Sequence, residues 1–382
     1  MSWFETVVDF IRELYNTNEF IPLHEPRFKG REIELLNECV RSTYVSSVGK
    51  FVADFEIGIQ KVVGSKKAVV IVNGTQALYL SLVISGIERG DEVITQPLTF
   101  IATANAISYA GAVPVFVDVD KETMGMSPAS LAEFLSINTE IRTDGHCYNK
   151  LTGNRILACV PMHTFGHPCR ITEIADICEK YRIELIEDAA ESLGSTFSGK
   201  HTGTFGRIGI LSFNGNKIIT TGGGGMIITD DIDIAQKAKH LSTQAKLPHP
   251  WEFNHDMIGY NFRLPNINAA LGMAQLEMLD VFLRSKRELA LLYHDFFFKL
   301  GVDFFIEPQG ANSNYWLNTV ILSNKKERDS FLQYTNDRGV MTRPAWTLMN
   351  DLPMYKKCTT FNVQNATWLS ERIVNLPSSA RI

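Results

Sequence analysis

The chain alternates short apolar runs with helix-like segments between about Lys67 and Asp230, and this alternation constrains its fold more than any other feature. Near-continuous apolar strands separated by helices are typical of a mostly parallel β-sheet that helices cover on both faces. In such sheets, ligands bind outside the carboxyl ends of the strands. The runs expected to form strands are AVVIVN, DEVITQP, AVPVFVDVD, RILACVPMH, RIELIEDAA, IGILSFNG and GGMIITD.

The flanking segments predict further parts of an α/β fold. Residues 136–155 are polar and rich in turn-forming residues, which predicts a surface hairpin. A long helical stretch is expected at about 267–300, followed by alternating strands and helices. We therefore expect an N-terminal segment packing on the body (1–33), a large domain with a seven-stranded, mostly parallel sheet (34–265), and a long helix with a smaller C-terminal α/β domain (266–382).

Composition excludes several classes of function. The net charge is −5, with 37 basic and 42 acidic residues and no basic run, which argues against a nucleic-acid or membrane partner. Six scattered cysteines without a CxxC pair indicate neither a disulfide scaffold nor a metal site. The N-terminus lacks the cationic start of a signal peptide, and no apolar stretch is long enough to span a bilayer. These features predict a cytoplasmic protein.

The stretch IVNGTQAL combines a strand, a tight turn and a helix start. Gly74 permits the turn, and Thr75 and Gln76 place backbone N–H groups and a hydroxyl at the helix N-terminus. Such an end binds anions, because its first N–H groups lack partners and the helix dipole is positive there. The same stretch is compatible with an ordinary capped helix start.

The stretch LIEDAAESLG ends another predicted strand with acidic and small residues. Asp188 and Glu191 flank two alanines, so a planar ligand could approach these carboxylates closely. The alternative is that Asp188 caps the N-terminus of a helix.

The stretch SFNGNKIITTGGGG places Lys217 before four glycines, whereas the usual phosphate loop places its lysine after them. A partly desolvated lysine is a usable amine nucleophile, although a lysine beside a glycine-rich turn is more often exposed to solvent. A phosphate cradle, a strand-end aspartate and a strand-end lysine are together what pyridoxal phosphate requires. We interpret Lys217 as the Schiff-base lysine and Asp188 as the partner of the pyridine nitrogen. The glycines are expected to let the backbone pass close to the cofactor and to an opposite subunit.

Seven motifs in order give the chain a resemblance to a known family, the DegT/DnrJ-type sugar aminotransferases, which are fold-type I enzymes that use pyridoxal phosphate. Within that family the chain resembles the branch that makes amino sugars for legionaminic acid, bacillosamine or perosamine. The motifs are FVADFEIGI, VNGTQAL, GDEVITQPLTFIATANAISYAGAVPVFVDVD, IEDAAESLG, SFNGNKIITTGGGG, GYNFRLPNINAALGMAQLE and NLPSS.

The resemblance implies roles for individual residues. Phe100 matches the aromatic residue stacked on the cofactor ring, with plain core packing as the alternative. Asn261 matches a residue that reaches the phosphate from the other subunit, which implies a homodimer with shared active sites. The remaining implied cofactor contacts are Gly74, Thr75, Gln76, Asp188, Glu191, Ser212 and Lys217, and the implied substrate contacts are Arg263, His163 and Tyr260.

Four further features of the chain bear on these roles. Glu191 stands where relatives often have Gln or His near the cofactor's phenolic oxygen, and the alternative for a carboxylate there is contact with the substrate. Gly222–Gly225 stand where relatives commonly read GEGG. His163 and His167 lack the carboxylate or cysteine partners at ligand spacing that a metal site would need. The resemblance implies a further strand or helix after LPSSARI, and a naturally short or a truncated chain is the expected explanation of its absence from the sequence.

The resemblance implies a transamination in two halves. L-glutamate would leave as 2-oxoglutarate, and the resulting pyridoxamine phosphate would aminate a nucleotide-linked 4-keto-6-deoxy sugar for a surface polysaccharide or lipopolysaccharide. The expected acceptor is the UDP-linked N-acetylhexosamine form, and the GDP-linked, perosamine-type sugar is the alternative. A noncatalytic nucleotide-sugar-binding homologue would be expected to lose Lys217 or Asp188, and a sugar 3-dehydratase would have histidine in place of Lys217.

Overall fold

The main β-sheet is formed by the seven predicted apolar runs together with three further strands. The computed structural model describes residues 3–382. From β10 to β3 the neighbouring strands are parallel, whereas β11 is antiparallel to both of its neighbours. The predicted mostly parallel α/β sheet is therefore confirmed. Its spatial order is β1 (Lys67–Ile71), β11 (Gly225–Thr229), β10 (Ile208–Ser212), β7 (Glu184–Asp188), β6 (Arg155–Val160), β2 (Glu92–Thr95) and β3 (Val113–Val117).

The three further strands extend one half of this sheet. β16 (Thr360–Phe361), from the C-terminal part of the chain, pairs in parallel with β3 and widens the sheet beyond the predicted seven strands. β4 (Thr139–Ile141) and β5 (Cys147–Asn149) form an antiparallel hairpin beside β6, so the predicted surface hairpin is also confirmed.

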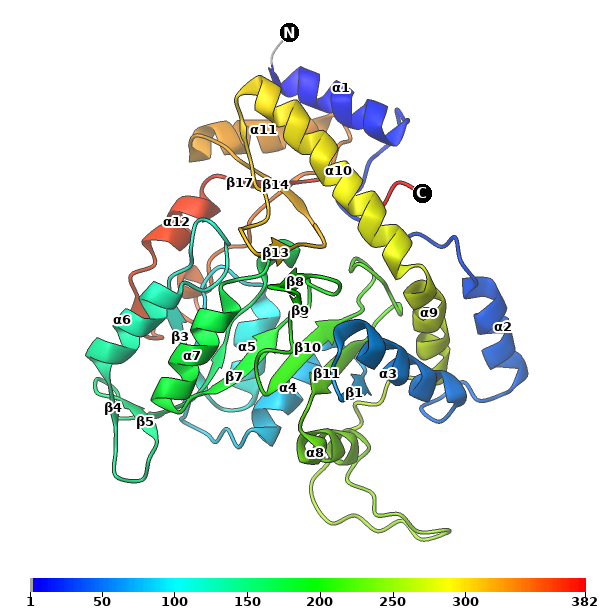
Figure 1. Cartoon of the computed structure of the whole chain (residues 1–382), viewed down its shortest axis with the longest axis vertical. Helices are drawn as coiled ribbons and strands as arrows, with labels where there is room; N and C mark the ends of the chain where they lie inside the picture. Colours follow the sequence, from blue (N-terminus) through cyan, green and yellow to red (C-terminus); the bar gives the residue numbers. More distant parts are fainter. Residues whose placement is uncertain (1–2) are drawn as a thin grey trace.

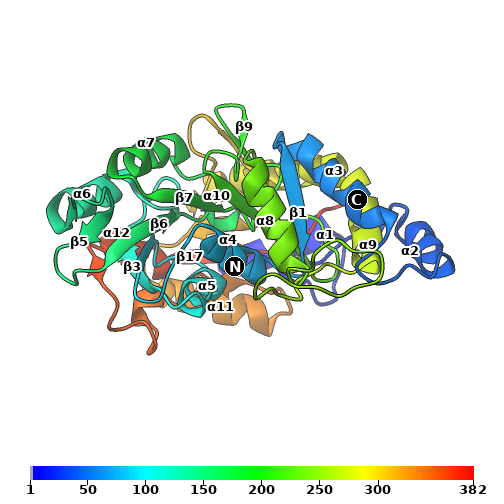
Figure 2. The ribbon, with the colours of Figure 1, turned by 90° about the horizontal axis from the view of Figure 1, so that it is seen from below.

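Helices cover both faces of the sheet (Figure 2). Successive residues of β1 alternate between the two faces: Val69 and Ile71 pack on one side, and Ala68 and Val70 on the other. One face carries α4 (Gly74–Ile84), α5 (Ile101–Tyr109) and α8 (Ile232–Ser242), and the other carries α3 (Lys50–Val63), α6 (Pro128–Asn138), α7 (Ile171–Tyr181) and α9 (Asn266–Glu277).

The long helix predicted for 267–300 is divided into two. α9 ends at Glu277 and α10 (Leu279–Leu300) begins after Met278. α9 packs closely on α3 and on α2 (Glu32–Arg41), and a side chain at Gly272 would lie 2.7 Å from Thr221. α10 continues away from the sheet toward the region that contains α1 and α11 (Figure 1). The break lets one helical stretch serve two packing surfaces.

A second, antiparallel sheet lies at the other end of the molecule (Figure 1), and its strands are β12 (Asp303–Phe304), β14 (Asn318–Ile321), β17 (Ile373–Leu376) and β15 (Arg343–Pro344). Its core is shared by α10, by α11 (Lys325–Asp337) and by α1 (Trp3–Tyr15), so a helix from the N-terminus packs among C-terminal elements. The expected segment 1–33 begins with two residues outside the described ones, and the domain limits at 33 and 265 stay a prediction. The other elements are β8 (Thr196–Phe197), β9 (Lys200–His201), β13 (Ala311–Asn312), α12 (Gln364–Ser370), η1 (Thr164–Gly166) and η2 (Met349–Asp351).

Within residues 3–382, no helix has both the length and the apolar character needed to cross a membrane.

Candidate active site

A cavity of about 300 Å³ lies at the carboxyl ends of β1, β7 and β10. Loops after these strands form its floor, and tryptophans from the C-terminal part of the chain close one side. This is the location expected for a ligand in an open α/β sheet. Its lining includes seven of the residues singled out in the sequence, namely Gly74, Thr75, Phe100, Asp188, Glu191, Ser212 and Lys217.

The N-terminus of α4 forms one end of the cavity. Asn73 caps the helix, because its side chain accepts a hydrogen bond from the Gln76 backbone N–H at 2.9 Å. A Cβ atom at Gly74 would lie 3.0 Å from the Cβ atom of Ser212, so the glycine lets α4 approach β10 closely. Thr75 and Ser212 line the cavity, but the side chain of Gln76 does not, and its buried Oε1 has no hydrogen-bond partner among the described residues.

The glycine run beside this end is constrained at three of its four positions. A Cβ atom at Gly224 would clash with the side chain of Thr221. Gly225 pairs with both β1 and β10, and a Cβ atom there would lie 2.5 Å from the Asn73 carbonyl oxygen. Gly222 has φ of +80°, which favours glycine. Gly223 has open space around it. The run therefore brings the backbone close to the chain's own α4 start, while its approach to a cofactor or a second subunit stays a prediction.

Asp188 ends β7 with its carboxylate facing the cavity. Its Oδ2 accepts a hydrogen bond from Thr103 Oγ1 at 2.7 Å, and its Oδ1 accepts one from the Ala190 N–H at 3.2 Å. Burial raises the pKa of Asp188, and the hydrogen bonds and the charge of Lys217 oppose this rise. The chain continues from β7 into a turn, so the alternative in which Asp188 caps a helix is wrong.

Lys217 points into the same cavity and is 13% exposed, so it is not an ordinary surface lysine. Its Nζ lies 3.2 Å from Glu191 Oε1 and 4.0 Å from the centre of the Trp316 ring. The other Glu191 oxygen accepts a hydrogen bond from the Phe165 N–H at 3.0 Å. Burial raises the pKa of Glu191 to about 7, although Lys217 and the Phe165 N–H act in the opposite direction.

Aromatic side chains form the remaining wall. Phe100 precedes α5 and is 48% exposed toward the cavity, which excludes plain core packing. Its ring centre lies 6.1 Å from that of Trp346. The sequence reasoning missed both Trp316 and Trp346, because they lie in loops before β14 and after β15 and no local pattern marks them. Asn73 could have been identified as an N-cap from its place before a helix start.

The structure places His163 behind Asp188 and outside the cavity lining. Its Nε2 lies 3.0 Å from Glu187 Oε2, and both side chains are fully buried. Burial alone would lower the pKa of His163, but Cys169 and Glu187 outweigh it and raise the pKa to about 10. The histidine is therefore half of a buried ion pair that supports the strand end.

Tyr260, Asn261 and Arg263 also lie outside the cavity that this chain forms by itself. They lie in the second half of the long loop that joins α8 to α9 (Figure 1). The Tyr260 hydroxyl lies 3.0 Å from that of Tyr79, and Arg263 donates two hydrogen bonds to Asn261 Oδ1 at 3.1 and 2.9 Å. In the part of the chain that the structure describes, no group of three or more His, Cys, Asp and Glu side chains could hold a metal ion.

The combination of a doubly covered parallel sheet with a buried lysine and carboxylates at its strand ends defines the class of fold-type I aminotransferases. The model of the DegT/DnrJ/EryC1/StrS aminotransferase family matches residues 26–382. The chain belongs to this family and is an enzyme, a sugar aminotransferase.

Individual relatives are similar to this chain over almost its whole length. The GDP-perosamine synthase of Escherichia coli O157:H7 is 37% identical over 362 residues, which cover 94% of this chain and 93% of the relative. The EpsN protein of Bacillus subtilis (strain 168) is 36% identical over 367 residues, which cover 95% and 92%. The crystal structure of the aminotransferase TlmJ from Streptoalloteichus hindustanus superposes with a TM-score of 0.85 at 28% identity, covering 94% of this chain and 93% of TlmJ.

Proposed function

We propose that this enzyme transfers the amino group of L-glutamate to a nucleotide-linked 4-keto-6-deoxy sugar, with pyridoxal phosphate as its cofactor. The observation that carries the proposal is the convergence of Lys217, Asp188 and the N-terminus of α4 on one cavity. Membership of an aminotransferase family supports the reaction class.

The residues present fit this cofactor. The helix start at Gly74 and Thr75, together with the Ser212 hydroxyl, would hold the phosphate. Asp188 would keep the pyridine nitrogen protonated, and the exposed ring of Phe100 would cover one face of the cofactor. When bound, the cofactor supplies an electron sink for the substrate's α-carbon.

The chain's own groups supply binding and proton transfer. Lys217 would carry the cofactor and then move a proton to and from the substrate carbon as general acid and base. Asp188 supplies a fixed negative charge that Thr103 and Ala190 orient by hydrogen bonds. Trp316 and Trp346 restrict access of water to the Lys217 amine.

The proposal is tested by recording the absorbance of the purified protein before and after adding L-glutamate. We expect the visible band of lysine-bound pyridoxal phosphate to disappear and a shorter-wavelength band of the aminated cofactor to replace it. Lys217→Ala is the control, since it should bind cofactor without giving the lysine-bound band. A wild-type protein that never develops this band, even with added cofactor, would favour a noncatalytic nucleotide-sugar-binding protein.

The acceptor sugar is identified in the second half of the same assay. The resemblance to the amino-sugar branch of the family implies the UDP-linked N-acetylated 4-keto-6-deoxy sugar, whereas the names of relatives such as the Escherichia coli GDP-perosamine synthase support the GDP-linked one. Each sugar would be added separately to the aminated enzyme. The true acceptor is the one that restores the lysine-bound band and yields an aminated nucleotide sugar by mass spectrometry.

We further propose a homodimer in which each site receives Asn261 and Arg263 from the other subunit. These residues do not line the cavity of their own chain, and the loop before them exposes Trp251, Phe253 and Ile258 at 76, 77 and 88%. Exposed apolar side chains in such number favour a protein partner.

Mixing two inactive variants, Lys217→Ala and Arg263→Ala, tests the shared site. Random subunit exchange should restore about a quarter of wild-type activity, because half of the dimers then hold one intact site. No recovery after verified exchange would show that each site is complete within one chain.

A further inference from the structure

We propose that Glu191 is a catalytic residue that exchanges a proton with Lys217, taking the proton that the Lys217 ammonium must lose before its amine can act and returning it afterwards. The N–H bond at Nζ breaks as the O–H bond at Oε1 forms, and the reverse step restores both groups. No oxidant or further reactant is needed. This inference rests on the proposed function, in which Lys217 acts as both nucleophile and base.

The distance and burial of the pair support direct proton transfer. Glu191 Oε1 lies 3.2 Å from Lys217 Nζ, and the Glu191 side chain is only 1% exposed. At this distance the two groups form a hydrogen bond that solvent does not interrupt. Burial raises the pKa of Glu191 to about 7, which is the value expected of a group that acts as acid and base near neutral pH.

The protein backbone is shaped to hold this carboxylate. Phe165 has φ of +56°, a conformation that is strained for a bulky residue, and its N–H donates to Glu191 Oε2 at 3.0 Å. The Asn314 side chain donates to the Glu191 carbonyl at 2.8 Å. One carboxylate oxygen is therefore fixed by the backbone while the other remains directed at Lys217.

The Lys217 head group is confined on its other side by Trp316. The indole ring centre lies 4.0 Å from Nζ, and the indole N–H donates to the Asn216 carbonyl at 2.6 Å. The amine is thus held within reach of Glu191. Further ionisable groups lie near this pair. Asp188 and His24 interact with the pair through their charges, and His163, Lys286 and Arg27 interact with these two neighbours.

The first test measures Lys217 itself in the cofactor-free, full-length protein. Brief labelling with acetic anhydride across a pH series, followed by peptide mass spectrometry, gives the pH at which the Lys217 amine becomes reactive. We expect Glu191→Gln to move this midpoint down by about one pH unit or more, because the neutral amide no longer stabilises the ammonium. In Glu191→Asp the labelling midpoint of Lys217 should stay close to that of the wild-type protein.

A matched control uses an acid–lysine pair outside the cavity. Glu56 Oε1 lies 2.7 Å from Lys239 Nζ, and Lys239 is 47% exposed. Glu56→Gln should leave the labelling midpoint of Lys217 unchanged. Melting curves of the cofactor-free variants identify any variant that does not fold. If Glu191→Gln does not fold, the labelling midpoint of Glu191→Asp is compared with that of the wild-type protein instead.

The second test follows the glutamate half-reaction in single turnovers as a function of pH. Glu191→Gln should slow the step by about 10²–10⁴-fold and remove the pH dependence near neutrality, and Glu191→Asp should retain that dependence. A uniform loss of rate with an unchanged pH profile, or an unchanged labelling midpoint in Glu191→Gln, would overturn the inference. If wild-type protein fails to react with glutamate, the proposed function fails, whereas the labelling result still decides whether Glu191 governs Lys217.

Discussion

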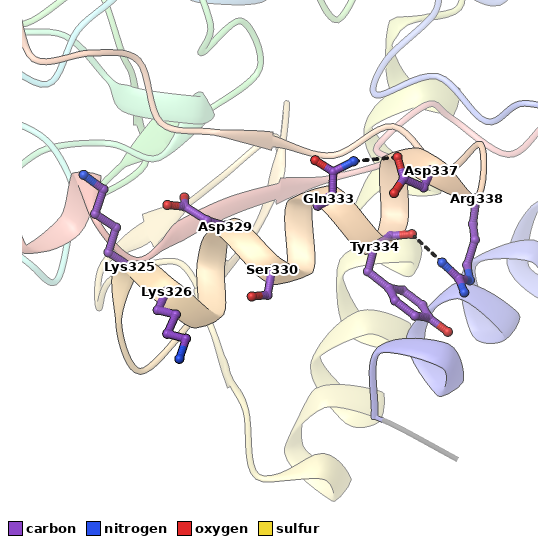
Figure 3. A pocket seen from close by; sticks show the side chains of 8 residues that line it. All are labelled: Lys325, Lys326, Asp329, Ser330, Gln333, Tyr334, Asp337 and Arg338. Atoms are coloured by element: carbon purple, nitrogen blue, oxygen red, sulfur yellow. Dashed lines mark hydrogen bonds between the residues drawn. The ribbon is translucent and has the colours of Figure 1, made fainter.

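Two hollows in this molecule differ in size, in construction and in chemistry. The larger, of about 800 Å³, lies along α11 and is lined by residues of that single helix and its end (Figure 3). The smaller, of about 300 Å³, is the candidate active site at the strand ends of the main sheet. The smaller one holds the groups with catalytic potential.

The α11 hollow carries charges that water and near neighbours already satisfy. Lys325 and Lys326 are exposed at the helix start, and Gln333 donates to Asp337 one turn away at 2.6 Å (Figure 3). Arg338 donates to the Tyr334 carbonyl at 3.3 Å. Side chains three or four residues apart on one helix can pair, but they cannot enclose a ligand.

The strand-end cavity, in contrast, is lined by segments that are far apart in the sequence. Asn73, Asp188, Ser212 and Trp316 meet there although they lie up to 243 positions apart. Burial within this cavity raises the pKa values of Asp188 and Glu191. Convergence and desolvation therefore distinguish a reactive site from a surface groove, whatever their relative volumes.

Replacing the central lysine should have the largest effect. Lys217→Ala removes an amine with two roles, since it carries the cofactor and acts as the general acid and base. General acid–base catalysis alone contributes about 10²–10⁴-fold to the reaction rate. We expect a loss of more than about 10⁴-fold in the rate of sugar amination, measured by chromatography of the nucleotide sugar. Lys326→Ala on α11 is the matched control and should keep the wild-type rate. Substantial activity in Lys217→Ala would contradict the assignment.

The buried ion pair behind the cavity should dominate stability. His163→Ala leaves the buried Glu187 carboxylate without its cationic partner, although three backbone N–H groups still donate to it. We therefore expect a cost of about 3 kcal/mol in the free energy of unfolding. Because the folded pKa of His163 is raised to about 10, its contribution is fully present below about pH 6.5 and is lost as the pH rises through about 10.

Urea unfolding at the two ends of this pH range measures the effect. The exposed pair His240–Asp256, at 2.7 Å, offers a matched control, and His240→Ala should cost at most about 1 kcal/mol. If the loss of unfolding free energy in His163→Ala is as large at the alkaline pH as at the lower pH, lost packing causes it, and not lost charge pairing.

Removing the negative charge of Asp188 should reduce catalysis without removing the cofactor. Asp188→Asn keeps the side-chain size, and we expect a loss of about 10²–10³-fold in the rate of the glutamate half-reaction. Stopped-flow absorbance gives this rate directly. Asp337→Asn on α11 removes a carboxylate of the other hollow and should change nothing in the same measurement. Equal rates in the two variants would mean that Asp188 contributes no more to catalysis than a carboxylate on the α11 surface.

The smallest effect is expected within the α11 hollow itself. Gln333→Ala removes one pair of side chains a helical turn apart and should change the free energy of unfolding by about 0.2–0.5 kcal/mol. Urea unfolding with wild-type protein as reference measures this difference. A loss above about 1 kcal/mol, or any loss of amination rate, would show that the hollow has a role that its exposed charges do not indicate.

Local patterns in the sequence were sufficient for much of this description. The near-continuous apolar runs and the helix-like segments between them predicted the covered parallel sheet, because a strand that is buried on both faces has apolar residues at successive positions. The strand ends then indicated where Asp188, Ser212 and Lys217 would meet, because the carboxyl ends of parallel strands share one edge.

Other features depended on contacts between distant segments. No periodic pattern in the sequence indicates these features. They are the pairing of Lys217 with Glu191, the wall made by Trp316 and Trp346, the place of His163 behind Asp188, and the break between α9 and α10. The physical reason is that hydrophobic periodicity records which face of an element is buried, but not which distant side chain it meets there. The sequence alone therefore determined the sheet and the position of its reactive edge, and only the tertiary structure decided which groups surround the lysine.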